Sequence, residues 1–184
     1  MSWMLIKRAI ALVVFLFAIS AGGCSSSNRV SLSPTGHIGP LRVDKSDRRD
    51  VIAFAGKPDS ERHGRYSDYP TFDALGYGCA GNAATDTGGG PRCKTVFYLD
   101  SRSGKLALVY TEDDRFVLHG VQVGTPKRTA ERFLHMRAFS GCFDGFRFET
   151  KTGFVVVWLG GGHVLFVVVH SQRLNPGVLD CIDS

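Results

Sequence analysis

The sequence predicts an α+β fold of two tandem repeats, each a short helical unit packed on an antiparallel β-sheet. Two short amphipathic helices, about 80 residues apart, each follow a glycine-containing strand segment. Runs of β-branched and aromatic residues, which are favoured in strands, come after each helix. Because the same order of elements occurs twice, we expect two related halves, one over about 37–115 and the other over about 116–184.

The first 23 residues have the pattern of an export signal. Lys7 and Arg8 give a positive start, and 11 apolar residues, Ala9 to Ile19, follow them. This run is too short to span a bilayer, which takes ~20 apolar residues, and it has the length typical of a signal peptide. We therefore expect residues 1–23 to be a signal peptide.

Small residues precede Cys24 and resemble the lipobox of bacterial lipoproteins, which is cut just before the cysteine that becomes lipidated. Ala21 stands where these lipoboxes usually have leucine, and a plain secretory signal with an incidental cysteine is the alternative. Residues 24–36 are expected to be the lipidated cysteine and a flexible linker that holds the domain roughly 20 Å from the membrane. We expect a lipid-anchored protein on the extracytoplasmic side of the cell membrane, or of the outer membrane in a host that has one.

The first helix is expected between Ser46 and Gly56. Ser46 is the predicted N-cap, because a serine hydroxyl can accept hydrogen bonds from the first free amides of a helix. Val51, Phe54 and Ala55 fall at positions i, i+3 and i+4, so they share one helical face. Gly56 can adopt the positive φ that commonly ends a helix.

Strands follow in the first half. Pro70 interrupts the aromatic run over 65–77, which therefore reads as an edge strand plus a loop. The runs over 95–99 and 105–110 flank a polar, glycine-containing turn, a pattern that predicts a β-hairpin. A further short strand, Arg115 to Leu118, leads into the second half.

The second helix is expected to start with Thr125 as its cap and Pro126 in its first turn. Ala130, Phe133 and Leu134 repeat the spacing of the first helix and predict its buried face.

A three-stranded meander is predicted after this helix, over 145–149, 154–159 and 163–170. Because these runs are almost continuously apolar, we expect both faces of the sheet to be covered there.

Four cysteines follow Cys24, and an even number in an exported protein predicts disulfides. Three pairings are available. We favour Cys79–Cys93 with Cys142–Cys181, because each bond then lies within one half. Metal binding is disfavoured, since no C-x-x-C pair occurs.

Familiar motifs of chemistry are missing or lack their context. Residues 76–81 match G-x-G-x-x-G, but no helix is predicted after them, as a dinucleotide site requires. His163 and His170 are seven residues apart on one strand, so they point to opposite faces, and surface or edge histidines are expected. No G-x-S-x-G surrounds any serine. We therefore expect no enzyme, and assign no catalytic, cofactor-binding or metal-binding residue.

Charge argues against a nucleic-acid partner. Removal of residues 1–23 takes away two basic and no acidic residues, so the formal charge falls from +5 to +3. The remaining basic residues are scattered and form no nucleic-acid footprint.

The paired strand-and-helix units resemble the signature of the β-lactamase-inhibitor-protein-like proteins and of the related small lipoproteins of the barrel-assembly machinery. The match is carried by residues 39–43, the short helix and residues 56–58. Gly124 keeps a signature glycine in the second unit, whereas Asp44 replaces it in the first. The resemblance implies helical units packed on antiparallel sheets, and a binding surface on a concave sheet and loops. No binding residue is carried over.

Aromatic residues exceed what one core stripe needs, so some are candidate interface anchors. The candidate interface residues are Trp158, Phe146, Phe148, Tyr66 and Tyr69. The resulting expectation is a membrane-anchored exported lipoprotein that acts as a protein-binding or envelope-associated module, one form of which is inhibitor-like. Its expected partners are the membrane, through the lipid, and an exported or envelope protein. The alternative is a small-ligand sensor or an exported hydrolase with a non-motif active site.

Overall fold

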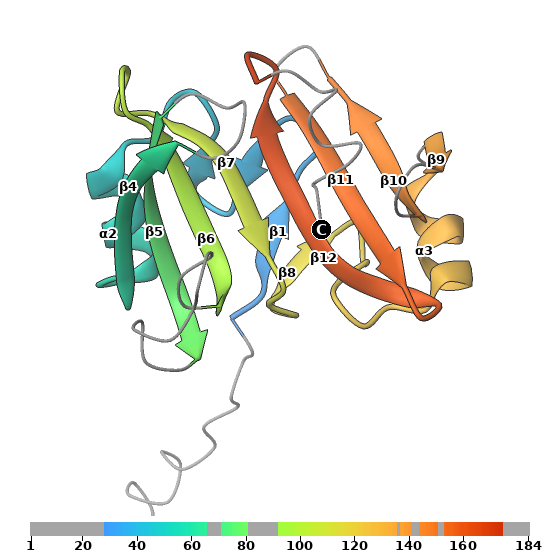
Figure 1. Ribbon diagram of the computed structural model, residues 1–184. Helices are drawn as coiled ribbons and strands as arrows, with labels where there is room; N and C mark the ends of the chain where they lie inside the picture. Colours follow the sequence, from blue (N-terminus) through green and yellow to red (C-terminus); the bar gives the residue numbers. More distant parts are fainter. Residues whose placement is uncertain are drawn as a thin grey trace, which may run out of the picture.

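A computed structural model describes residues 28–65, 71–80, 92–135, 137–140, 144–150 and 153–174. Most of these residues lie in two β-sheets, and two α-helices are present among them (Figure 1). The larger sheet has eight antiparallel strands in the order β4-β5-β6-β7-β12-β11-β10-β9. In chain order these strands are β4 (Ser60–Arg65), β5 (Thr71–Ala80), β6 (Arg92–Asp100), β7 (Leu106–Thr111), β9 (Arg137–Ser140), β10 (Asp144–Glu149), β11 (Gly153–Gly160) and β12 (His163–Ser171). The α+β class is therefore confirmed.

The smaller sheet has the order β3-β2-β1-β8, with β1 (Val30–Leu32), β2 (His37–Ile38), β3 (Leu41–Arg42) and β8 (Phe116–Leu118). β1 pairs parallel with β8 and antiparallel with β2. Residues 28–36 were expected to be linker, and this is wrong: they belong to the folded domain, because β1 satisfies its backbone groups on β2 and β8.

Helix α2 (Arg48–Ala55) begins at Asp47, not at Ser46 as the sequence suggests. The Asp47 carboxylate accepts from the amides of Arg49 and Asp50, and the Asp50 carboxylate accepts from the Asp47 amide, which makes a capping box. The Ser46 hydroxyl instead accepts from the Arg42 amide at 3.0 Å.

Helix α3 (Lys127–Leu134) differs from its expected form in two ways. Pro126 is the N-cap residue and makes no side-chain cap, while the Thr125 hydroxyl accepts from the Gln122 amide. Ala130 and Leu134 are buried as expected, but Phe133 is 49% exposed.

The chain runs through a helix and then four consecutive antiparallel strands, twice over. The first set is β4 to β7, the second is β9 to β12, and the two sets join where β7 pairs with β12. The predicted β6–β7 hairpin and the predicted meander of β10, β11 and β12 are both confirmed.

The main core lies between one face of the large sheet and a layer formed by α2, α3 and the small sheet. Figure 1 shows the two helices at opposite ends of the large sheet, with β1 and β8 between them. Alternate residues of β11 divide between the faces: Val155 and Val157 belong to this core, and Val156 and Trp158 belong to a second cluster. Both faces of the meander are covered at β11, which is buried from Gly153 to Leu159, whereas Leu165 on β12 is 46% exposed.

Candidate binding groove

A groove of about 1160 Å³ lies on the helix side of the large sheet, in the first half of the chain. Its lining comes from the start of β1, the Gly39–Pro40 turn, the last turn of α2, the facing ends of β5 and β6, and the turn before β8. These segments are far apart in the sequence, and pairing of β1 with β8 and of β5 with β6 brings them together.

Three aromatic rings from three elements form the floor of the groove. Phe97 on β6 is 1% exposed, and both Phe54 on α2 and Tyr77 on β5 pack edge-on against it, at centroid distances of 6.4 and 5.6 Å. The Tyr77 hydroxyl donates to the Gly56 carbonyl at 3.1 Å, which ties the end of the helix to the sheet. Burial is the main cause that raises the pKa of Tyr77, so this phenol stays neutral.

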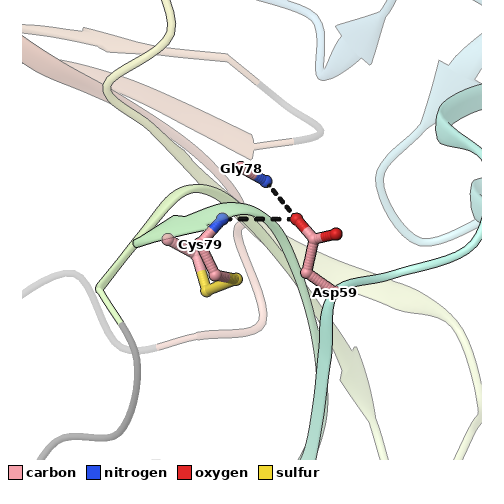
Figure 2. The surroundings of a disulfide bond; sticks show 4 residues. Asp59, Gly78 and Cys79 are labelled. Atoms are coloured by element: carbon pink, nitrogen blue, oxygen red, sulfur yellow. Dashed lines mark hydrogen bonds between the residues drawn. A yellow bond between two sulfur atoms is a disulfide. The ribbon is translucent and has the colours of Figure 1, made fainter. Parts of the chain in front are cut away.

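Asp59 fixes the end of β5 beside the groove. One of its carboxylate oxygens accepts from the Gly78 amide at 2.6 Å and from the Cys79 amide at 3.2 Å (Figure 2). Pairing between β4 and β5 extends only to Gly76. Beyond it, the Asp59 carboxylate accepts the hydrogen bonds of the β5 amides that have no β4 partner. Gly78 has a φ of +63°, a conformation that glycine adopts readily.

The disulfide expected between Cys79 and Cys93 is present and joins β5 to β6 directly beyond the groove. The two cysteines are cross-strand partners. The bond therefore holds together the two strand ends that carry the floor.

The turn before β8, which also lines the groove, contains an ion pair between Arg115 and Asp113. Arg115 donates through its side chain to both oxygens of Asp113, with a shortest distance of 2.6 Å, and Asp113 is only 9% exposed. Burial by itself raises the pKa of Asp113, but the hydrogen bonds from Arg115, with a contribution from Lys94, outweigh it, so the pKa of Asp113 is lowered. This carboxylate stays ionised.

The groove is also lined by charged side chains that make no ion pair among the described residues. Arg29, Lys57 and Lys94 are exposed, and none of them has an ion pair within the part of the chain that the structure describes. Asp114 is the acidic lining residue that is not already holding backbone amides or Arg115. The groove thus combines an apolar aromatic floor with charged side chains at its rim whose net formal charge is +1, an arrangement suited to a ligand with apolar and anionic parts.

The predicted interface residues lie elsewhere. Phe146 is 4% exposed in the main core, so it is not an exposed anchor. Phe148 is half-buried against the same core and does not line the groove. Trp158 is 1% exposed in the second cluster, where it stacks on Phe166 at 5.5 Å. Tyr66 and Tyr69 lie outside the described residues, as do Cys24, Cys142 and Cys181.

The described side chains offer little for catalysis or metal binding. The Nδ1 atom of His63 is 2.6 Å from an Asp73 carboxylate oxygen, but both side chains are well exposed on neighbouring strands near the sheet edge. Within the described ranges, no serine or cysteine is hydrogen-bonded to His63, and no three His, Cys, Asp or Glu side chains cluster as a metal site.

Sequence reasoning did not find the groove, because its lining is dispersed over residues 28–116. The surplus of aromatics in the first half was the available signal, and Tyr77 is among them.

Comparisons give no family assignment: no protein-family model and no curated protein matches the sequence. Similar solved structures include an extracellular protein with an SCP domain from Bacillus anthracis (10% identity, TM-score 0.46, 73% of this chain and 45% of that chain covered). A DUF4309 family protein from Bacillus subtilis is 15% identical with a TM-score of 0.44, covering 73% of this chain and 84% of that one. A cysteine-rich secretory protein from Staphylococcus aureus is 12% identical with a TM-score of 0.43, covering 71% and 47%. The chain therefore spans less than half the length of the first and the third.

Proposed function

We propose that the protein is an exported lipoprotein, anchored through Cys24 on the extracytoplasmic side of a membrane, that binds an exported protein partner in the groove. The signal pattern before Cys24 supports export and lipidation. The Cys79–Cys93 bond is also compatible with export, because disulfides persist in oxidising compartments. No helix within the described residues is both long and apolar enough to cross a bilayer.

The groove is the observation that carries the binding proposal. The half-buried rings of Phe54 and Tyr77 offer aromatic area of the kind that dominates protein interfaces, and the buried Phe97 supports both of them from below. The charged side chains at the rim can orient a partner. The disulfide and the Asp59 clamp hold the floor in place before a partner arrives, which lowers the entropic cost of binding.

The proposal includes descent of the two halves from one repeated unit, as in the β-lactamase-inhibitor-protein-like proteins. The repeated order of a helix and four antiparallel strands supports it, with β7 and β12 at the junction. Inhibition of an exported enzyme and a role in envelope assembly are two forms that this binding could take. A small-ligand sensor or an exported hydrolase is the alternative, and the size of the groove is the observation that favours the sensor.

A steric block tests the groove. Ala55 lines it from the last turn of α2, whereas Ala53 is exposed on another face of the same helix. Residues 25–184, which contain every described residue, are used as bait against envelope extract, with Ala55→Trp as the blocked variant and Ala53→Trp as its matched control.

We expect the wild type and the Ala53→Trp bait to retain the same partner and the Ala55→Trp bait to lose it. Retention of no protein by the wild type, together with saturable binding of a metabolite, would favour the sensor. Trp158→Ala is unsuitable as a probe, because it removes a buried ring and destabilises the fold.

A further inference from the structure

We propose that the groove rim is a membrane-facing surface, on which Arg29, Lys57 and Lys94 contact the headgroups of anionic phospholipids. This inference rests on the lipid anchor of the proposed function, and it adds an orientation for the molecule and a second ligand class.

Few residues separate Cys24 from the described domain. The described chain begins at Asn28 and Arg29, and both residues line the groove. Cys24 lies four residues before Asn28, and an extended chain spans at most about 3.5 Å per residue, so Asn28 cannot lie more than about 14 Å from the lipidated cysteine. A lipid on Cys24 therefore keeps this end of the domain next to the headgroups, instead of on a long flexible linker.

The charged residues that line the groove differ in whether they have partners. Of the acidic residues that line the groove, Asp59 is engaged by the amides of Gly78 and Cys79, and Asp113 by Arg115. The three cations Arg29, Lys57 and Lys94 are exposed and have no ion pair within the described ranges. With Arg115 they face Asp59, Asp113 and Asp114, so the lining carries a net formal charge of +1. Basic residues attract anionic lipids only within about a Debye length of the surface, roughly 8 Å at physiological salt. The short tether allows Arg29, which follows Asn28 directly, to reach that range.

Contact of the rim with headgroups leaves the aromatic floor of the groove available to a protein partner. The floor faces the same opening as the rim cations, so a protein partner reaches it along the membrane surface. This predicts a partner that is itself membrane-associated.

Vesicle co-sedimentation of residues 25–184 tests the rim without the lipid anchor. The probes are phosphatidylcholine vesicles and vesicles in which a quarter of the lipid is phosphatidylglycerol. Lys57→Gln/Lys94→Gln is the test variant. Arg128→Gln/Arg132→Gln removes the same net charge from exposed positions on α3 and is the matched control. Thermal unfolding of all three proteins verifies that they are folded.

We expect binding to the phosphatidylglycerol vesicles alone, weakening as salt increases. The test variant should bind roughly 25-fold more weakly, about fivefold for each lysine removed, whereas the control variant should stay within about twofold of the wild type. Equal binding to both vesicle types, or equal losses in the two variants, would overturn the inference. Loss of vesicle binding in inorganic phosphate at constant ionic strength would overturn it in favour of a soluble-anion site. Partner capture blocked by Ala55→Trp is measured separately, so failure of the rim and failure of the groove can be told apart.

Discussion

At the scale of single residues, His170 is the ionisable group whose surroundings depart most from expectation. A surface or edge histidine was predicted, and this is wrong: His170 is 1% exposed and stacks on Phe154 at 4.7 Å. Its Nδ1 atom donates to the Ser171 carbonyl at 3.0 Å, and its Nε2 atom has no hydrogen-bond partner within the described part of the chain. Burial is the main cause that lowers the pKa of His170 to about 4. The apolar run around it hid this position, since periodicity places a residue on a face without saying what covers that face.

Replacement of His170 should change how stability depends on pH. Above pH 6.5 the imidazole is neutral in both states and contributes no slope. As the pH falls from 6.5 towards 4, the unfolded chain binds a proton that the folded chain excludes, so the folded state loses stability. The free energy of unfolding should drop by about 2 kcal/mol between pH 7 and pH 5 from this group.

The measurement is urea unfolding of the wild type, His170→Phe and His163→Gln at the two pH values. His170→Phe should lack this drop, and His163→Gln, at an exposed position, should keep it. Identical pH dependence in His170→Phe and the wild type would show that His170 is not buried neutral.

At the scale of elements, the end of the β5–β6 pair shows what spacing can predict and what it cannot. The even cysteine count and the separation of the halves predicted the Cys79–Cys93 bond. The surrounding glycines match a nucleotide motif in letters only, and the structure gives a physical reason for Gly76. A Cβ atom there would lie 2.6 Å from the Cys93 sulfur, so this glycine makes room for the disulfide. Only the cross-strand register, which sequence periodicity does not provide, reveals that contact.

Gly76→Ala should therefore destabilise the protein by about 1–3 kcal/mol, because the added methyl overpacks against the sulfur atoms. Loss of the disulfide through Cys79→Ala/Cys93→Ala should cost about 3 kcal/mol by itself, from the entropy of the opened loop.

Denaturant unfolding of the single, double and triple variants forms a mutant cycle for this contact. In the cysteine-free background the cost of Gly76→Ala should fall by more than half. Additive costs would mean that Gly76 is required for a reason other than the disulfide.

At the scale of the whole molecule, the order of most helices and strands along the chain was predictable from the sequence, whereas the pairing of distant strands was not. Hydrophobic periodicity predicted α2, α3, the β6–β7 hairpin and the β10–β12 meander. It could not predict that a serine-rich stretch supplies β1, because a three-residue strand is specified by its pairing with β8, 86 residues further along the chain. The groove depends on that pairing, and so it was missed.

The proposed lipid anchor on Cys24 determines where the whole molecule is found in the cell. Under the proposed anchoring, Cys24→Ala should shift the protein from the membrane fraction to the soluble fraction, because it removes the proposed acylation site and basic side chains alone bind a membrane reversibly. Cell fractionation at low and at high salt measures this. A Cys24→Ala protein as firmly bound as the wild type at high salt would point to an uncleaved apolar anchor.

The central claim is that a membrane-anchored groove binds a partner, and photo-crosslinking in intact cells tests it most directly. A photoreactive phenylalanine analogue is placed at Ala55, which lines the groove, or at Ala53 on the outer face of α2, in the full-length chain. We predict one discrete protein adduct from position 55, none from position 53, and a weaker adduct when Cys24→Ala releases the protein from the membrane. No adduct from position 55, or the same adducts from both positions, would contradict the account.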